Sequence, residues 1–382
     1  MTGSLQIKKG YFYAVLNLKN ESGKRKPKWI ATGLEVKGNK RKANEFLNQQ
    51  IAEYSAKKHI EPSKVLFCDF VKEWVTATKN RVQITTHNNY VHMLFKHIYP
   101  YFKDLGITIS QIKITHLERY YSEKVSEGLS PNTVKKHHSV IRSALQTALK
   151  EELVSQNVAD LAEKPKKKSF NGSFYNQDEL NKLFKVVKGS PIETPVLLAT
   201  YLGLRRSEVI GLKWDCVDFT RKTISINHKV VRAYEDGKMS VFQTDELKTE
   251  SSYRVFDLEP QILYYLATLK QKQAGRKSIL KGGYVKEYSD YICVNEIGDL
   301  IKPDFVSAKF KKILAKNGLK HIRFHDLRHS CASLLLSLDY NMKEIQEWLG
   351  HSNYQTTANL YAHVDPRSKK TMINGIAGAL SI

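Results

Sequence analysis

The first 56 residues alternate in polarity as expected for a small sheet followed by a helix. Aromatic and aliphatic residues fill positions 11–18, polar residues form a turn over 20–28, and an extended pattern resumes at 29–32. Over 41–54 the apolar residues recur at helical spacing. They are Ala43, Phe46, Leu47, Ile51 and Tyr54. The pattern predicts an N-terminal domain, residues 1–56, made of a three-stranded sheet and one helix.

A polar segment over 55–64 leads into a stretch whose pattern is helical throughout. Its first helix carries an apolar face made of Phe67, Phe70, Val71, Trp74 and Val75. Ser130 and Pro131 supply the polar cap and the early proline that start a later helix. The apolar face of that helix comprises Val134, His138, Ile141, Leu145 and Leu149. We therefore expect an all-helical domain over residues 63–163.

The basic, extended segment 164–168 is the clearest boundary in the chain. Beyond it, alternating residues over 223–232 and 253–258 predict strands, and the region from 326 onward has mostly helical patterns. Residues 170–382 are thus expected to form a mixed, mainly helical domain with a small β-sheet and a small, apolar C-terminal tail. The predicted fold class is multidomain α+β.

The charge of the chain indicates its class of partner. The 382 residues include 61 Lys and Arg against 38 Asp and Glu, a formal net charge of +23. Such a surplus favours a polyanion, because each neutralised phosphate releases condensed counterions. An anionic membrane would also attract it, but no stretch approaches the roughly 18 apolar residues of a membrane span, and no signal peptide pattern begins the chain. Nucleic acid is the expected partner.

The cysteines argue against a zinc site or a disulfide framework. The four, Cys68, Cys216, Cys293 and Cys331, lie far apart and form no Cys-x-x-Cys pair. Buried, reduced thiols in a cytoplasmic protein are the expectation, and the sequence indicates no metal and no cofactor.

Three groups of basic residues are candidates for DNA contacts. They lie in the N-terminal turn, along one side of the helix that Pro131 begins, and in the basic linker. The candidates are Lys24, Arg25, Lys26 and Lys28, then Lys135, Lys136, His137 and Arg142, then Lys166 and Lys167. Each could equally be an ordinary solvated residue, since charged runs usually lie on solvated surfaces.

Two local clusters in the last domain place an arginine close to a glycine or to a histidine. In the first, Gly203 permits a sharp turn, Ser207 is a plausible helix cap, and Arg205 lies at a helix entrance, where an anion can bind. In the second, His325 and Arg328 are three residues apart and share a helical face. An imidazole that exchanges protons near neutral pH thus lies beside a permanent cation.

A third cluster runs from Trp348 to Val364. Gly350 is a natural helix stop, and Thr356 or Thr357 can start the next helix. Tyr361 is therefore expected on a short helix just past a loop. Alone, a tyrosine among apolar neighbours is usually a core residue.

Taken together, the three clusters resemble the tyrosine recombinase (phage integrase) family. The resemblance rests on the Gly-Leu-Arg-x-Ser-Glu run, the His-x-x-Arg pair, the Leu-Gly-His-Ser step and a terminal Tyr, in the family's order. The first two predicted domains resemble the family's arm-binding and core-binding domains. The family also has a lysine on a β-hairpin between the first two clusters. Lys248, followed by a Thr and Ser run, fits that position better than Lys238. Ten residues separate His351 from Tyr361, where nine is commoner in the family.

The resemblance implies an enzyme that breaks and rejoins DNA without a cofactor. Its implied catalytic residues are Arg205, Lys248, His325, Arg328, His351 and the nucleophile Tyr361, with Glu208 orienting its neighbours. The reaction would pass through a 3′-phosphotyrosine and a Holliday junction, with four protomers on two double-stranded attachment sites. An excisionase and a DNA-bending host protein are possible partners. We expect a cytoplasmic, DNA-associated protein encoded by a bacterium or a phage.

Three alternatives remain open at this level. A type IB topoisomerase uses similar chemistry, but the arm-like domain and the Leu-Gly-His-Ser step argue against it. A catalytically idle DNA-binding regulator is disfavoured because the full set of reactive residues is present. A chromosomal Xer-type recombinase is the third, and such relatives generally lack the first domain.

Overall fold

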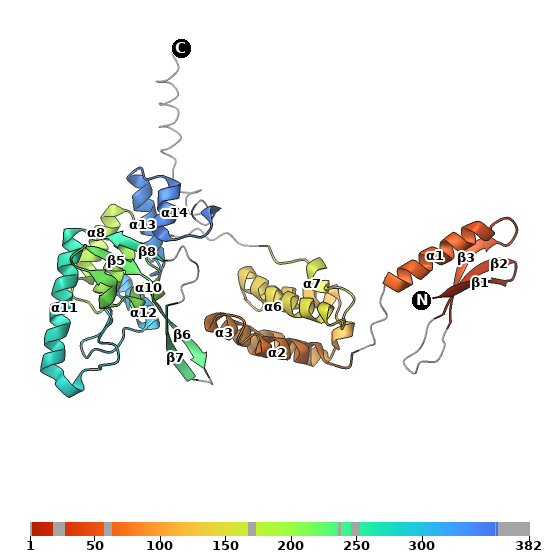
Figure 1. Cartoon of the computed structure of the whole chain (residues 1–382), viewed down its shortest axis with the longest axis horizontal. Coiled ribbons are helices and arrows are strands. Elements are labelled where there is room, and N and C mark those ends of the chain that lie inside the picture. The colour runs from red at the N-terminus through yellow and green to blue at the C-terminus, as the bar shows by residue number, and fades with distance from the viewer. Residues whose placement is uncertain are drawn as a thin grey trace, which may run out of the picture. The chain divides into compact units, whose positions relative to one another are not determined.

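The computed structural model describes residues 2–17, 27–56, 63–166, 173–235, 238–245, 253–355 and 357. The chain divides into two compact units, residues 1–169 and 170–382, which Figure 1 colours from red through yellow and from green to blue. Six of the candidates lie outside the described residues: Lys24, Arg25, Lys26, Lys167, Lys248 and Tyr361. No described helix is long and apolar enough to cross a membrane.

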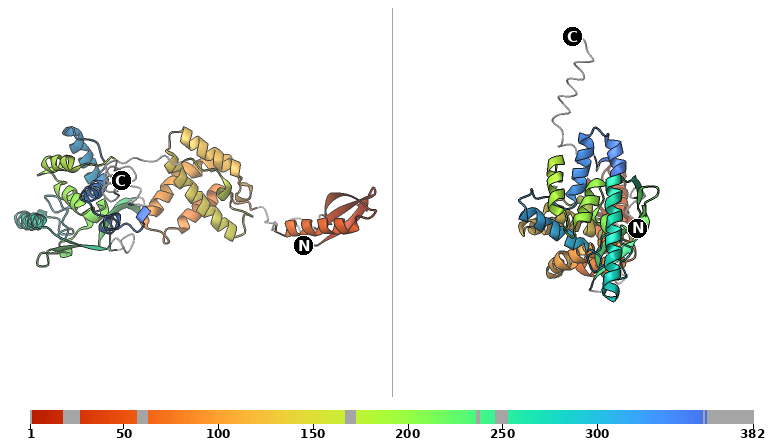
Figure 2. Two further views of the ribbon diagram at one scale, coloured as in Figure 1. Left: turned by 90° about the horizontal axis from the view of Figure 1, so that it is seen from above. Right: turned by 90° about the vertical axis from the view of Figure 1, so that its left-hand side faces the viewer.

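The N-terminal part of the first unit is a three-stranded antiparallel sheet with a helix packed on one face (Figure 2). The strands are β1 (Gly3–Lys8), β2 (Tyr11–Leu16) and β3 (Lys28–Glu35), and the helix is α1 (Lys40–Ala56). Ala14 and Leu16 from β2 meet Leu47 from α1 in a small buried core. The predicted three-stranded sheet with one helix is confirmed.

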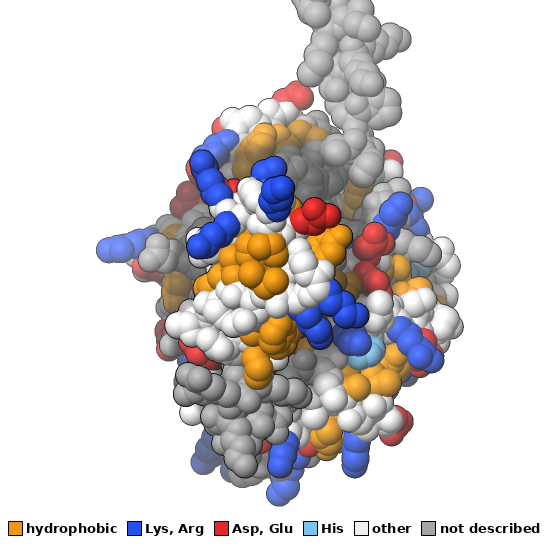
Figure 3. Space-filling view, turned by 90° about the vertical axis from the view of Figure 1, so that its right-hand side faces the viewer, with side chains coloured by type: hydrophobic (Ala, Val, Ile, Leu, Met, Phe, Trp, Pro, Cys, Tyr) orange, Lys and Arg blue, Asp and Glu red, His pale blue; other side chains and the backbone are white. Residues whose placement is uncertain are grey.

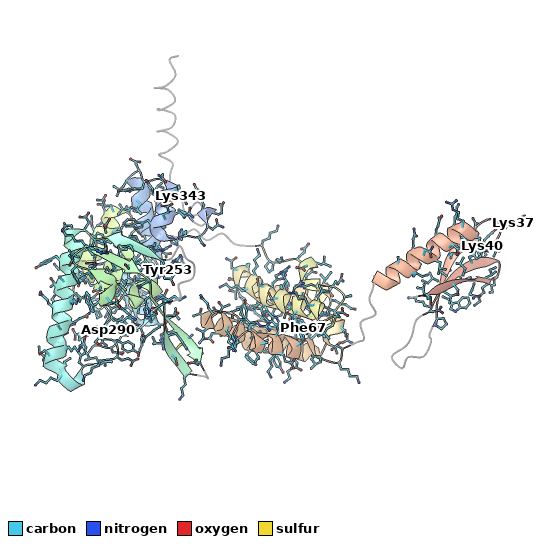
Figure 4. All side chains as sticks on the ribbon, viewed as in Figure 1. Lys37, Lys40, Phe67, Tyr253, Asp290 and Lys343 are labelled. Carbon is cyan, nitrogen blue, oxygen red and sulfur yellow. The ribbon has the colours of Figure 1, made fainter. Side chains whose placement is uncertain are left out.

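The rest of the first unit is helical. Its elements are α2 (Phe67–Ala77), α3 (Ile84–Met93), the π-helical turn η1 (Leu94–Ile98), α4 (Tyr99–Leu105), the short η2 (Ile109–Gln111), α5 (Ile114–Ser126), α6 (Pro131–Lys150) and α7 (Val158–Leu161). Ser130 caps α6 by accepting the Thr133 N–H at 3.1 Å, as the sequence predicts. Phe67, labelled in Figure 4, packs edge-on against Phe102 in the core between the helices.

The second unit surrounds its core with helices and two small sheets. Its helices are α8 (Gln177–Val187), α9 (Glu193–Tyr201), α10 (Arg206–Gly211), η3 (Trp214–Cys216), α11 (Pro260–Leu280), η5 (Lys281–Gly283), α12 (Pro303–Lys316), α13 (Asp326–Ser337) and α14 (Met342–Leu349). The strands β4 (Val217–Asp218), β5 (Thr223–Ile226) and β8 (Arg254–Asp257) form one antiparallel sheet, and β6 (Lys229–Glu235) pairs with β7 (Lys238–Thr244). All four cysteines are buried and free.

The single strand expected over 223–232 is wrong, because the chain breaks there into β5 and β6 of different sheets. His228 lies at the break, buried, with its ring bonded to Asp245 at 2.5 Å and to the Tyr291 hydroxyl at 2.9 Å. Gly211 at the end of α10 packs so closely on β6 that a Cβ there would lie 2.7 Å from the Lys229 Cα. These tertiary contacts override the local alternation.

Candidate active site

The entrance of α10 fixes Arg205. Gly203 turns the chain with φ +61°, a conformation that favours glycine, and Arg205 occupies the residue before the helix. The Glu208 carboxylate accepts the Arg205 backbone N–H at 2.9 Å and its guanidinium at 2.6 Å. Glu208 therefore anchors the start of the helix, and the expectation that Ser207 caps it is wrong.

Arg328 lies in the first turn of α13 and is almost completely buried, with 1% of the residue exposed. It donates to the Gly203 carbonyl at 2.6 Å and to the Leu349 carbonyl. Burial, followed by the nearby charge of Arg205, lowers the pKa of Arg328 to about 9. The side chain is therefore still a cation at neutral pH.

Three guanidinium groups converge on the end of α14. Gly350 ends this helix with φ +64°, leaving its last carbonyls without helical partners. Arg205 donates to the Gly350 carbonyl at 3.1 Å, and Arg328 and Arg254 both donate to the Leu349 carbonyl. A helix C-terminus carries partial negative charge and so favours cations. The first and third sequence clusters, together with Arg328 of the second, are thus in direct contact.

Arg254, at the start of β8, is the residue that sequence reasoning missed. It donates to the Glu208 carboxylate at 3.0 Å, so that Glu208 lies between two arginines. Burial raises the pKa of Glu208, but Arg254 and Arg205 outweigh burial and leave that pKa below its ordinary value. The only sequence signal for Arg254 is its place on a predicted strand after the Thr and Ser run.

His351 follows the end of α14 directly and is half-buried. Its Nδ1 lies 2.9 Å from the Thr357 hydroxyl, and its carbonyl accepts from the Gln346 side chain at 2.9 Å. Burial, with added repulsion from Arg328 and Arg205, lowers the pKa of His351 to about 3. The ring is neutral at pH 7 and able to donate or accept one hydrogen bond at Nε2.

His325 is the residue directly before α13. Its ring lies edge-on to that of His329, with centroids 5.3 Å apart. Surrounding protein atoms, His329 and Arg328 lower the pKa of His325, although the residue remains exposed. His325 is therefore neutral at pH 7 and able to accept a proton.

The arrangement is suited to an anion. Arg205, Arg328 and Arg254 carry three positive charges against the one negative charge of Glu208, and two neutral imidazoles stand beside them. An incoming phosphate would raise the pKa of both histidines by opposing the repulsion from the arginines. Among the described residues no group of three or more His, Cys, Asp or Glu side chains is placed to hold a metal ion.

Two other basic residues of the second unit lie apart from this cluster. Arg206 points to α12 and donates to Ser307 at 2.6 Å. Lys238 lies opposite Glu235 in the register of β6 and β7, at the end of the hairpin far from Thr244. Within the described part of the chain, neither residue forms a hydrogen bond or ion pair with Arg328 or Arg254.

The basic candidates of the first unit are placed unequally. His137 is completely buried, and its ring bonds the Tyr120 hydroxyl at 2.9 Å, so its assignment to a DNA-facing side is wrong. Arg142 forms an ion pair with Asp160 at 2.5 Å and stays partly exposed. The other described candidates are exposed or half-exposed: Lys28, Lys135, Lys136 and Lys166. Figure 3 shows Lys and Arg side chains spread across one face of the molecule, with hydrophobic side chains between them.

Comparison with known proteins decides the family. The profile of the phage integrase family matches residues 173–368, just over half of the chain, and that of the phage integrase SAM-like domain matches residues 66–168. The chain belongs to the phage integrase family. Among its relatives, a XerC-like tyrosine recombinase from Caldanaerobacter subterraneus is 28% identical, over 70% of this chain and 71% of its own. The ICEBs1 integrase of Bacillus subtilis is 26% identical, over 75% and 76%.

Solved structures share the fold of this integrase family member. The Tn1549 transposon integrase in complex with transposon right end DNA matches 82% of this chain and 100% of its own, with TM-score 0.65 and 18% identity. A lambda integrase tetramer bound to a Holliday junction matches 91% and 95%, with TM-score 0.55 and 17% identity. The predicted multidomain α+β fold is confirmed. By its family, the protein is a tyrosine site-specific recombinase.

Proposed function

We propose that this recombinase is an integrase that inserts a mobile element into DNA and excises it again. The observation that carries the proposal is the convergence of Arg205, Arg328 and His351 on the end of α14, with His325 beside Arg328. This is a preformed anion site with two neutral proton-exchanging groups. Relatives named as integrases of a transposon and of ICEBs1 support the same reading.

In the proposed reaction the phenol oxygen of Tyr361 attacks the scissile phosphorus. The bond from phosphorus to the 5′ oxygen breaks, and Tyr361 is left joined to the 3′ phosphate. His325 takes the phenol proton, and Lys248 gives a proton to the departing 5′ oxygen. The freed 5′ hydroxyl of the partner duplex then reverses these steps, so the bond energy is kept and no ATP is consumed.

Arg205 and Arg328 stabilise the charge that develops on the non-bridging oxygens. Preformed donors in a site shielded from water are most effective when they face the transition state. Both side chains are held by backbone carbonyls and need little reorganisation to bind phosphate oxygens. His351 would add a hydrogen bond through Nε2, because its Nδ1 is already engaged with Thr357.

The N-terminal sheet and helix favour an integrase over a Xer-type recombinase. Residues 1–65 lie outside both family profiles. We propose that the unit formed by β1–β3 and α1 binds arm-type DNA sites, with Lys24, Arg25, Lys26 and Lys28 near the phosphates. The core site would be bound by the helical part, residues 63–163, and by residues 170–382. Lys135, Lys136, Lys166 and Lys167 would contact its phosphates.

Four protomers on two attachment sites are the proposed assembly, since two strand exchanges through a Holliday junction require four nucleophiles. An excisionase and a DNA-bending host protein are proposed partners. The host is proposed to be a bacterium or a phage-infected bacterium, with the protein in the cytoplasm on DNA.

The deciding experiment traps the covalent intermediate. The protein is mixed with nicked suicide duplexes drawn from the DNA beside its gene, and the products are run on a denaturing gel. We expect a shifted protein–DNA band that Tyr361→Phe abolishes, while DNA binding is unchanged because only one oxygen is removed. Tyr354→Phe is the matched control, since Tyr354 is an exposed tyrosine seven residues away, and it should leave the band intact.

Other outcomes point elsewhere. Loss of both the band and DNA binding in Tyr361→Phe would make this tyrosine structural. Tight binding without any covalent band from the wild type would favour an idle regulator. Recombination on bare core sites, with no gain from flanking DNA, would favour the Xer-type alternative, whereas relaxation of supercoils without strand exchange would favour a topoisomerase.

A further inference from the structure

Arg254 is a buried cation without a role in the reaction described above. Only 7% of its side chain is exposed, against 27% for Arg205. One end of its guanidinium donates to the Leu349 carbonyl and the other to Glu208 at 3.0 Å. Its Nε is buried with no hydrogen-bond partner in the structure. Both terminal nitrogens are engaged inside the protein, one of them by the Glu208 carboxylate, so the charge of Arg254 is already paired with an internal anion.

Burying such a group is costly, and burial lowers the pKa of Arg254 despite the adjacent carboxylate. The stability of the fold alone does not explain why an arginine is buried here, because apolar residues of the same volume usually stabilise a fold as well as a buried ion pair does. The guanidinium also lies 5.5 Å from the centre of the Phe256 ring, which packs on Trp348 of α14. Arg254 thus joins β8 to the last turn of α14.

Charge balance gives Arg254 a specific task. Glu208 holds Arg205 at the helix entrance, yet its negative charge also offsets the positive charge of Arg205 where phosphate is to bind. A second cation bonded to the same carboxylate neutralises it from the protein side. The sum over the cluster is then two positive charges, which matches the two negative charges of a five-coordinate phosphorus intermediate with unprotonated non-bridging oxygens.

We propose that Arg254 is a positioning residue for DNA cleavage, acting through Glu208 on Arg205 and through the Leu349 carbonyl on the segment that leads to His351. It holds the Arg205 guanidinium in place and keeps the full charge of that group available to the phosphate. The inference rests on the proposed cleavage chemistry but concerns a residue that does not meet the substrate.

The test compares two scissile groups in single-turnover cleavage of a suicide duplex. One duplex carries the ordinary phosphate, and the other carries a methylphosphonate, in which a neutral methyl replaces a charged non-bridging oxygen. We expect Arg254→Gln to slow cleavage of the phosphate by about 100-fold, the effect of misplacing a catalytic group by an ångström. On the methylphosphonate, Arg254→Gln should slow cleavage by less than about 10-fold, since there is less charge to neutralise.

Two further variants separate positioning from a general structural defect. Because part of the effect of Arg254 passes through Arg205, the double variant Arg205→Ala with Arg254→Gln should be slowed on phosphate by clearly less than the product of the two single effects. Arg254→Lys keeps the charge but cannot span both acceptors, and should fall between wild type and Arg254→Gln. Arg276→Gln is the matched control, because Arg276 forms only a surface ion pair with Glu296, and it should match the wild type.

Equal slowing on both scissile groups, or additive effects in the double variant, would overturn the proposal. If Arg254→Gln does not fold, Glu208→Gln combined with Arg254→Gln removes both charges and leaves the same sum of two positive charges, so any slowing should be equal on the two scissile groups; selective slowing on the phosphate would then overturn the charge argument. A wild type that forms no covalent complex with either duplex would instead contradict the proposed function. The two failures are therefore distinguishable.

Discussion

Two buried histidines in the helical part of the first unit should make its free energy of unfolding fall as the pH is lowered. His137 and His138 on α6 are 0% and 3% exposed, and their Nδ1 atoms each lie 2.9 Å from a tyrosine hydroxyl of α5, Tyr120 and Tyr121. The Nε2 atom of each ring is buried with no partner in the structure. Protonation would add an unsatisfied, charged N–H to the core, so both rings resist it.

The size of the effect follows from the pKa values. Burial, then repulsion from His97 and Lys124, lowers the pKa of His137 from 6.5 to about 4, and burial with Lys164 and Arg142 does the same for His138. The unfolded chain binds the two protons near pH 6.5, whereas the folded chain binds them only near pH 4. Stability is therefore complete above pH 6.5 and is lost as the pH falls towards 4. Between pH 7.5 and 5.0 the loss is roughly 2 kcal/mol for each histidine.

Hydrogen exchange read by mass spectrometry measures this locally in the full chain, without requiring two-state unfolding. After correction for the intrinsic effect of pH, the most protected amides of α5 and α6 should open about 4 kcal/mol more easily at pH 5.0 than at 7.5. His138→Gln should remove about half of this pH dependence, whereas His321→Gln, which changes an exposed histidine, should remove none. Ring resonances of His137 or His138 that titrate near pH 6.5, or equal protection at the two pH values, would refute the reasoning.

Three further outcomes follow from the second unit. Gly203→Ala should lower the free energy of unfolding by about 1–3 kcal/mol in denaturant titrations, because its Cβ would lie 2.6 Å from a leucine methyl of α14. Gly189→Ala, which has a similar positive φ but open space, measures the backbone cost alone. Arg206→Ala should keep suicide-duplex cleavage within about 3-fold of wild type, whereas Arg205→Ala should lower it by about 100-fold or more. Lys248→Ala should slow cleavage of an ordinary 5′ oxygen and recover with a 5′-bridging sulfur, a better leaving group; no recovery would remove Lys248 as the general acid.

Local patterns were enough to predict the elements that bury one face or carry a cap. The amphipathic residues of α2, the Ser130 cap of α6 and the glycine stop of α14 each depend on neighbours within about four positions. The strands over 11–18 and 29–32 and the helix over 41–54 were predictable from the alternation or spacing of their own residues. The split of 223–232 was not, because His228 and Gly211 make contacts with residues 17 to 63 positions away along the chain.

The wrong assignment of His137 shows how a charge pattern misleads. The charge pattern places His137 with Lys135 and Lys136 on a basic side of the helix. Yet His137 is three residues after Val134 and four before Ile141, and residues at those spacings share one face of a helix. The periodicity that predicted the apolar face of α6 therefore included His137, and a neutral imidazole with a tyrosine partner can be buried there.

The three sequence motifs of the second unit were recognisable singly, but the hydrogen bonds between them were not predictable. Arg328 of the second motif donates to the carbonyl of Gly203 in the first, and Arg205 of the first donates to the carbonyl of Gly350 in the third. Both glycines have positive φ, and their turns leave a carbonyl for a guanidinium to bind. Each motif therefore donates a guanidinium hydrogen bond to a carbonyl of another motif or accepts one from it, between residues 125 and 145 positions apart. A glycine in these motifs is required for the electrostatics of the site as well as for the turn, and Arg254, which no motif contains, completes the same network from β8.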